Sequence, residues 1–274
     1  MKNPSVTSIN ILKVRNDELR ETGDILAVEE PLEIGLSLPS AQPPVFRKNI
    51  SITMRTPGDD TDLALGFLFT EGILISPRQV EEVQQEENTI HIQLNTSIPV
   101  DLGKLERHFY TSSSCGVCGK SSIAAITTVC RVPAGTTKLK IAAKLMTGFP
   151  ELLRKEQAVF DRTGGLHAAA LFDTGGKLLS LREDVGRHNA LDKLIGAAFR
   201  EDRLPLDKHL LLLSGRASFE LIQKAAMAGI QFVMAVGAPS SLAVETAKKF
   251  NITLTGFLSK DRFNVYHGAE RIGF

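Results

Sequence analysis

The stretch Ala168-Ala169-Ala170-Leu171-Phe172-Asp173-Thr174-Gly175-Gly176-Lys177-Leu178-Leu179-Ser180-Leu181 decides the fold of this chain. Two apolar runs flank an Asp-Thr-Gly-Gly turn, which is a strong signal for a β-hairpin. Downstream of it, apolar segments of helical and strand length alternate, an order typical of a parallel α/β layer. We predict helices over 190–199, 219–228 and 242–250, and strands over 210–213, 232–236 and 252–257.

Three loops follow the strands of this layer, and small residues are frequent in them: 214–218, 237–241 and 258–262. In open α/β sheets, ligands bind beyond the carboxyl ends of the strands. The first two loops each open a helix, whose free backbone N–H groups bind anions. Arg216 and Arg262 add charge and directional donors. The sequence therefore predicts an anion-binding edge, with ordinary turns as the alternative interpretation.

A dense polar run, 182–193, connects the hairpin to the next helix. Loops of this kind often build functional sites. Asp184 or Asn189 is a candidate cap of the helix. The candidates to reach a bound phosphate or to orient a nucleophile are Arg187, His188 and Lys193. A solvated helix start is the alternative, and both interpretations apply equally to His188 and to His167, which follows a glycine pair.

Toward the N-terminus the pattern changes to that of a small α+β lobe. Alternating residues predict strands over 32–38, 50–54 and 90–94, and Asp59 or Asp60 is placed to cap a helix over 63–70 that stops at Gly72. The acidic run 81–87 is interpreted as a solvated face, and the first twenty or so residues as a polar tail. We expect the small lobe over 1–110 and an α/β domain over 111–274.

Two cysteines three apart, Cys115 and Cys118, lie at this boundary in a serine-rich and glycine-rich loop. The following apolar segment, 123–129, is a predicted helix, so its N-terminal dipole and Lys120 should lower the pKa of either thiol. Reactive sulfur chemistry is the favoured interpretation, with metal binding or inert packing as alternatives. A structural zinc site would need a second pair of ligands, but Cys130 has no paired ligand beside it. A deaminase-type zinc motif is also missing.

Composition narrows the function classes further. Lys and Arg total 32 against 31 for Asp and Glu, so the formal charge of +1 gives no bulk attraction for nucleic acid. Three cysteines in 274 residues do not form a secreted disulfide framework. The apolar runs are too short to span a bilayer, and no signal core opens the sequence. We therefore expect a cytoplasmic protein that binds no membrane, with its thiols reduced at rest.

With these segments assembled, the chain resembles the formate dehydrogenase accessory sulfurtransferase (FdhD) family. The resembling stretches are spread over most of the length: Arg55-Thr56-Pro57-Gly58-Asp59-Asp60, Ser113-Ser114-Cys115-Gly116-Val117-Cys118-Gly119-Lys120, Thr163-Gly164-Gly165-Leu166-His167, Arg182-Glu183-Asp184-Val185-Gly186-Arg187-His188-Asn189, Ser214-Gly215-Arg216 and Phe263-Asn264-Val265-Tyr266. This resemblance implies a three-layer, cytidine-deaminase-like α/β core without the zinc chemistry.

The resemblance also implies the function, which is sulfur delivery. A cysteine desulfurase would load a persulfide onto Cys115, and the sulfur would pass to the molybdenum cofactor, a bis(molybdopterin guanine dinucleotide), before its insertion into the formate dehydrogenase catalytic subunit. Cys118 matches the second cysteine of the motif. A passive cofactor-binding chaperone is the alternative, and a thioredoxin-like oxidoreductase is a weaker one.

By the resemblance, the cofactor-binding segment corresponds to residues 257–262 of this chain. The loop 214–218 and the polar run 182–193 contribute three further candidates. No permanently bound metal is expected, and a homodimer is left open. The expected cofactor-binding residues are Phe257, Leu258, Ser259, Lys260, Asp261, Arg262, Gly215, Arg216 and His188.

Overall fold

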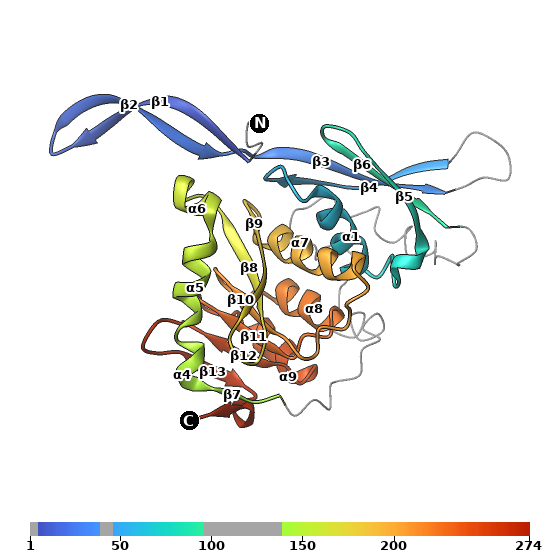
Figure 1. Cartoon of the computed structure of the whole chain (residues 1–274), viewed down its shortest axis with the longest axis vertical. Coiled ribbons are helices and arrows are strands. Elements are labelled where there is room, and N and C mark those ends of the chain that lie inside the picture. Colours follow the sequence, from blue (N-terminus) through green and yellow to red (C-terminus); the bar gives the residue numbers. More distant parts are fainter. Residues whose placement is uncertain (1–4, 39–45, 96–138) are drawn as a thin grey trace.

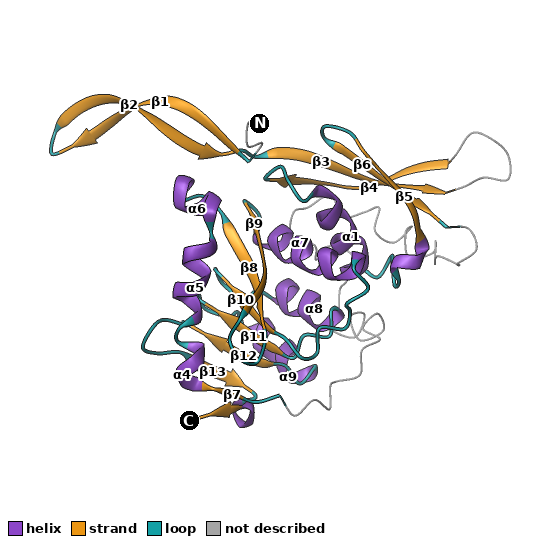
Figure 2. Cartoon of the chain, in the orientation of Figure 1, coloured by secondary structure: helices purple, strands orange, loops and turns teal. Residues whose placement is uncertain are grey.

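The computed structural model describes residues 5–38, 46–95 and 139–274 of the chain. A large sheet carries helices on both faces, a smaller sheet lies beyond one helical layer, and a long hairpin projects from the body (Figure 1). The helices gather between the two sheets and on the far side of the large one (Figure 2). The fold is therefore mixed α/β, as expected, while the deaminase-like character of its core stays a prediction.

The elements have the following bounds. The strands are β1 (Val6–Arg15), β2 (Glu18–Ala27), β3 (Glu30–Leu38), β4 (Phe46–Arg55), β5 (Val80–Gln85), β6 (Thr89–Leu94), β7 (Ile141–Ala142), β8 (His167–Phe172), β9 (Leu178–Asp184), β10 (Leu210–Leu213), β11 (Phe232–Ala235), β12 (Thr253–Gly256), β13 (Asn264–His267) and β14 (Ile272–Gly273). The helices are α1 (Asp60–Thr70), α4 (Ala143–Met146), α5 (Phe149–Glu156), α6 (Ala158–Thr163), α7 (Arg187–Arg200), α8 (Phe219–Met227) and α9 (Ser241–Lys249), with 3-10 turns at Pro77–Gln79 and Ala269–Arg271.

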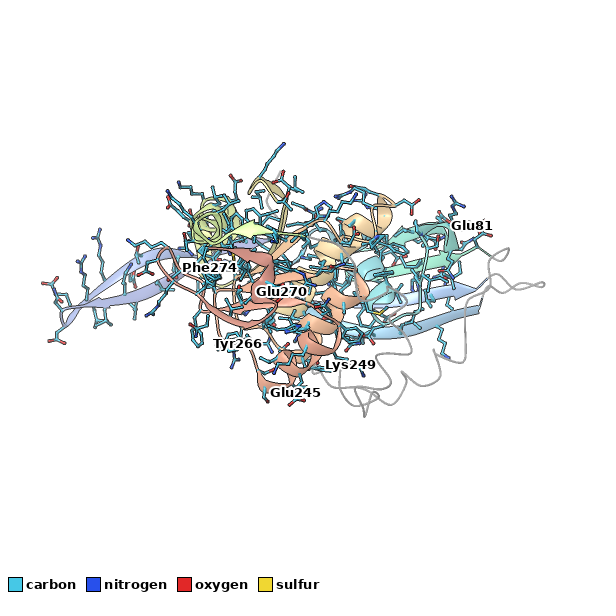
Figure 3. The ribbon with its side chains drawn as sticks, turned by 90° about the horizontal axis from the view of Figure 1, so that it is seen from below. Glu81, Glu245, Lys249, Tyr266, Glu270 and Phe274 are labelled. Carbon is cyan, nitrogen blue, oxygen red and sulfur yellow. The ribbon has the colours of Figure 1, made fainter. Side chains whose placement is uncertain are left out.

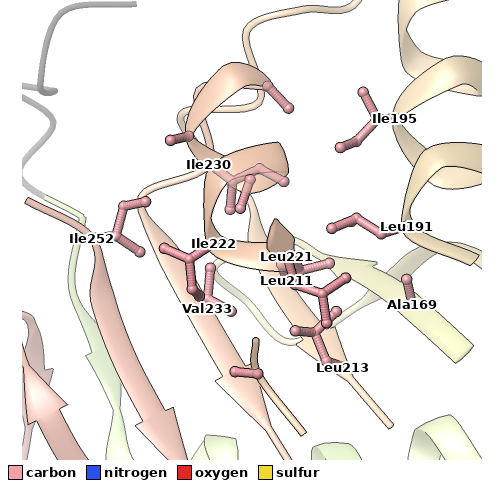
Figure 4. Close-up of a cluster of buried hydrophobic side chains, with 14 of the residues drawn as sticks. Ala169, Leu191, Ile195, Leu211, Leu213, Leu221, Ile222, Ile230, Val233 and Ile252 are labelled. Atoms are coloured by element: carbon pink, nitrogen blue, oxygen red, sulfur yellow. The ribbon is translucent and has the colours of Figure 1, made fainter. Parts of the chain in front are cut away.

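The large sheet has the strand order β13-β12-β11-β10-β8-β9. Strands β10, β11 and β12 run parallel, and β8 and β9 form the predicted antiparallel hairpin beside them. On one face, side chains such as Leu211 and Val233 pack against Ile222 of α8 in a fully buried cluster (Figure 4). Burying each such side chain stabilises the fold by about 1.5–3 kcal/mol. On the other face, Phe149 of α5 stacks on Phe172, with ring centroids 4.4 Å apart.

The smaller sheet has the order β4-β3-β6-β5 and packs one face on α1. The predicted strands and helix are all present, and Gly72 ends α1 with a φ of 75°. Helix α1 crosses α7 at two glycines: a Cβ on Gly66 would collide with the Asp192 carbonyl, and one on Gly196 with the Asp62 carbonyl. Since only hydrogen atoms fit between these backbones, the glycines set how closely the two lobes approach.

Buried ion pairs accompany this crossing. Arg55 donates two hydrogen bonds of 3.0 Å to Asp60, and Lys224 contacts Asp192 at 2.8 Å. Asp59 or Asp60 was expected to cap α1, but neither side chain does. The Asp59 carboxylate lies 3.4 Å from Arg182, and the Asp60 carboxylate is bound by Arg55. Buried carboxylates are stable only when they are paired in this way.

The N-terminal residues differ from the expected polar tail, because they form the hairpin of β1 and β2. Asn16 and Asp17 make its two-residue turn with φ of 50° and 62°, the left-handed conformation that asparagine and aspartate tolerate best. The acidic run is exposed as predicted, but much of it is the edge strand β5. In the view from below, Glu81 of β5 lies at the opposite end of the molecule from the hairpin (Figure 3).

Helices α4, α5 and α6 were not predicted, because short segments rich in Lys, Glu and Arg resemble solvated loops in sequence. The expected division of the chain at 110/111 lies outside the described residues and stays a prediction. The predicted helix over 123–129 lies outside them as well.

Candidate functional site at the carboxyl edge of the large sheet

The three small-residue loops meet at one edge, as predicted. Backbone hydrogen bonds continue the sheet beyond its strands, from Gly237 N to the Gly215 carbonyl (2.9 Å) and from Phe257 N to the Gly237 carbonyl (3.1 Å). These loops lie so close together that position 237 requires glycine, because a Cβ there would lie 2.9 Å from the Arg216 backbone nitrogen. The loops therefore form one surface at the carboxyl ends of β10, β11 and β12.

Two histidines join this edge from neighbouring elements. His167 begins β8, which runs antiparallel to β10, so it lies at the end of the sheet where the Gly215 loop leaves. A Cβ on Gly215 would be 3.3 Å from His167 Nδ1, which shows how closely the imidazole covers this loop. Burial, followed by the charge of Arg187, lowers the pKa of His167 below its ordinary value. The imidazole is therefore uncharged at neutral pH.

His188 lies in the first turn of α7 and faces the start of α8. Its Nε2 is 3.2 Å from the Ser218 hydroxyl and 3.7 Å from the Glu220 carboxylate. Burial lowers the pKa of His188 to about 4, with contributions from Lys224 and Arg187. At neutral pH the ring is thus a neutral hydrogen-bonding group and not the cationic partner of Glu220. Ser218 belongs to the predicted loop 214–218, whereas Glu220 was not predicted, because an acidic residue in the first turn of a helix is ordinary and gives no signal of a site.

Two arginines beside the histidines add positive charge to this edge. Arg187 and Arg216 have no carboxylate partner within the described part of the chain, and the buried Nε of Arg187 has no hydrogen bond there. Helices α7 and α8 begin beside them, at Gly186 and Ser218, without a side-chain cap. Uncapped N–H groups and unpaired guanidinium groups together favour a bound anion.

The side chains of the segment 257–262 differ in how accessible they are to a ligand. Phe257 is 46% exposed and has a φ of 52°, which is strained for a residue with a ring. Leu258 is buried in the core, so only its backbone could reach a ligand. Ser259 donates a 2.7 Å hydrogen bond to Asp261, which lowers the pKa of that carboxyl. The side chains left for a ligand are those of Phe257, Lys260 and Arg262.

The polar run 182–193 divides into a structural part and a part that faces the edge. Lys193 was expected to reach a phosphate, which is wrong, because its Nζ is 2.7 Å from the Asp184 carboxylate and both groups are buried. Asp184 also accepts from the backbone of Gly186 (2.8 Å) and Thr56 (3.2 Å), and Asn189 donates to the Met54 carbonyl. The groups that make these hydrogen bonds hold the two lobes together and are not available to a ligand.

The predicted reactive cysteines, Cys115 and Cys118, lie outside the described residues, as do Lys120 and Cys130. Among 5–38, 46–95 and 139–274, no group of three or more histidine, cysteine or acidic side chains is placed to hold a metal ion. Within the same residues, no helix has both the length and the apolar character that crossing a membrane requires.

Comparisons with known proteins agree with this architecture. A family model described as the FdhD/NarQ family matches residues 28–273. The chain is similar to proteins named "Sulfur carrier protein FdhD" from Streptomyces coelicolor, 46% identical with 96% of this chain and 94% of that protein covered, and from Saccharolobus solfataricus, 39% identical with 97% and 98% covered.

A solved structure shares the fold. It is the crystal structure of a protein from Desulfotalea psychrophila described as a formate dehydrogenase accessory protein. The TM-score is 0.76 at 23% sequence identity, and the match covers 98% of this chain and 100% of that one.

Proposed function

The chain belongs to the FdhD/NarQ family, and from this premise we propose that it is a sulfur carrier for formate dehydrogenase. Its relatives that carry this name match nearly the whole length of the chain, which is the observation that supports the proposal most directly. Within it, Cys115 is the acceptor. Its thiolate attacks the outer sulfur of the desulfurase persulfide, the S–S bond breaks, and the desulfurase cysteine leaves as a thiolate.

The sulfur is destined for the molybdenum cofactor, which is a substrate here. A bis(molybdopterin guanine dinucleotide) is a polyanion with two nucleotide ends. Three features support binding of such an anion at the carboxyl edge. Within the described residues, Arg187 and Arg216 have no carboxylate partner and helices α7 and α8 begin without a side-chain cap, and Lys260 and Arg262 are exposed. The exposed ring of Phe257 adds a surface on which a base can stack.

Loading of sulfur is tested with a cysteine desulfurase and L-cysteine. We expect intact-mass and peptide mass spectrometry to find one added sulfur, about 32 Da, on Cys115, and reduction to remove it. The variant Cys115→Ala should lose the adduct and the activation of formate dehydrogenase, while Cys130→Ala, the matched control, keeps both. If an active desulfurase leaves no adduct on Cys115 or Cys118, the protein is a passive cofactor-binding chaperone.

Binding of the nucleotide end is tested separately. Removing one charged donor should cost about 1.5–3 kcal/mol, so Arg216→Ala and Arg262→Ala should weaken calorimetric binding of a guanosine nucleotide by about 10- to 100-fold. Persulfide loading should not change in either variant. Arg162→Ala, an exposed arginine on α6, is the control. Unchanged affinity in both edge variants would reject this location for the cofactor.

A further inference from the structure

Glu220 places a carboxylate at an edge where cations are frequent. It is the second residue of α8, and its side chain is 21% exposed. Its Oε2 lies 3.7 Å from Nε2 of His188, and the same nitrogen is 3.2 Å from the hydroxyl of Ser218. The carboxylate therefore lies where the first turns of α7 and α8 meet, beside the loop 214–218.

Among the described residues, no charged partner balances this carboxylate at neutral pH. Lys224 lies one turn further along α8, at the spacing that favours a Glu–Lys pair. Its ammonium is instead 2.8 Å from Asp192 and donates a hydrogen bond of 2.9 Å to Thr70. His188 is uncharged at neutral pH, because burial lowers its pKa to about 4. Glu220 is therefore left without an ion pair in this part of the chain.

The carboxylate of Glu220 still needs hydrogen-bond donors, because most of its surface is covered. A charged group that loses contact with water is stable only when other donors replace the water. A glutamate in the first turn of a helix is stabilised by the helix dipole, which is the ordinary explanation of its place. The dipole does not satisfy its two oxygens, which together accept up to four hydrogen bonds.

The charges around Glu220 determine which kind of donor fits. Arg187 and Lys224 both lower the pKa of His188, so cations already lie close to the carboxylate. They would repel a metal ion or an amine, whereas they would not repel an uncharged ring that carries N–H groups. Glu220 is therefore better suited to an uncharged N–H donor than to a cation.

Guanine and pterin present the same donor edge, in which a ring N–H stands beside an amino group. Two parallel hydrogen bonds from such an edge match the two oxygens of one carboxylate. Adenine presents an acceptor nitrogen beside its amino group, and this nitrogen would repel the carboxylate. The molybdenum cofactor contains both guanine and pterin.

We propose that Glu220 binds the donor edge shared by guanine and pterin and thereby sets the ring specificity of the carboxyl edge. This inference rests on the proposed function, which brings such a cofactor here. Strand β10, which leads to α8, is two strands from β12, which leads to Phe257. Two strand spacings separate these positions by about 10 Å. The ring bound by Glu220 is therefore not the ring that stacks on Phe257.

Calorimetric titration of the full chain with GDP and with ADP tests this specificity. The variant Glu220→Gln keeps the size of the side chain but replaces one acceptor oxygen with a donor amide. We expect its affinity for GDP to fall about 10- to 100-fold. Its affinity for ADP should rise about fivefold or more, because an amide pairs with adenine. Glu245→Gln, exposed on α9 (Figure 3), is the matched control and should change neither affinity.

Titration with 6-hydroxymethylpterin separates the two rings. A loss of affinity in Glu220→Gln that is confined to GDP assigns Glu220 to guanine. A loss confined to the pterin assigns it to the pterin end of the cofactor, and a loss for both shows that the shared edge itself is recognised. Each of these results supports the proposal.

Three outcomes would overturn the proposal. They are a Glu220→Gln variant that binds GDP and the pterin as tightly as the wild type, GDP and ADP affinities that fall by the same factor, and a wild-type chain that binds neither ring. In the first two cases, weaker GDP binding by Arg216→Ala would leave the proposed cofactor site standing. The third outcome would reject that site as well.

Discussion

At the scale of single residues, the partly buried histidine of α7, His188, makes the stability of the protein sensitive to mild acid. The pKa of His188 is lowered to about 4 by burial, whereas in the unfolded chain it returns to about 6.5. Between these values the unfolded state binds a proton that the folded state does not, so stability falls as the pH drops. The expected loss from pH 7 to pH 5 is about 2 kcal/mol.

Urea unfolding of the wild type and of His188→Gln at both pH values measures this loss. Glutamine does not titrate, so the variant should lose about 2 kcal/mol less than the wild type on going to pH 5. Equal pH dependence of the two proteins would show that His188 is not the group responsible.

Lys193 is also a residue whose role is structural. Its ammonium pairs with the fully buried Asp184 carboxylate, so Lys193→Ala leaves that charge without a partner. We expect a loss of about 3–5 kcal/mol in the free energy of unfolding. Lys155→Ala, which breaks an exposed pair with Glu151, should leave the free energy of unfolding nearly unchanged, because water screens the pair. Similar losses in the two variants would contradict the structural role.

The polar run 182–193 shows why sequence alone could not assign these roles. Arg187 and Lys193 are both cations near one helix start, and their residue types do not reveal which one faces the ligand edge. The distinction depends on partners such as Thr56 and Asp184 that only folding brings together. The sequence predicted where the charged groups cluster. Tertiary contacts decide which of them are paired inside the protein, as Lys193 is with Asp184.

At the scale of elements, the glycine crossing of α1 and α7 should tolerate no side chain. A methyl group on Gly66 would collide with backbone, which cannot rotate away. We expect Gly66→Ala to destabilise the protein by about 2–4 kcal/mol, as overpacking at a rigid contact does. Gly23→Ala, where no atom lies within 4 Å, should have little effect. Thermal unfolding of the two variants measures the contrast, and equal melting temperatures would refute it.

Strands and helices with strong apolar periodicity were predicted well, because burial and pattern agree in them. Strand β10 has the bounds that its four leucines predict, and helices α7, α8 and α9 begin within three residues of their expected starts. Helices α5 and α6 were missed, since they have only eight and six residues and charged side chains are frequent in both. The hairpin was missed for a different reason: its aliphatic residues alternate over exposed positions, and the Asn16-Asp17 turn is its only clear local signal.

At the scale of the whole molecule, the two lobes share a core. Phe199 of α7 belongs to the buried cluster of the smaller sheet, and its ring lies 5.4 Å from that of Phe69. We therefore expect the fragment 1–110 to remain unfolded by itself, because α1 would expose its apolar face. Proton NMR of the fragment should show poorly dispersed amide signals. Well-dispersed signals and a cooperative melt would show that the lobe folds independently.

The crossing of α1 with α7 also has a consequence for synthesis on the ribosome. Helix α1 ends at Thr70, but its partner does not begin until Arg187. At about 5–20 residues per second, roughly 6–25 s pass before the covering helix has been made. During this interval the nascent chain presents the unpaired face of α1, with Asp62 and Thr70, to the surrounding solution. A chaperone that holds nascent chains should therefore associate during synthesis and leave once α7 has emerged.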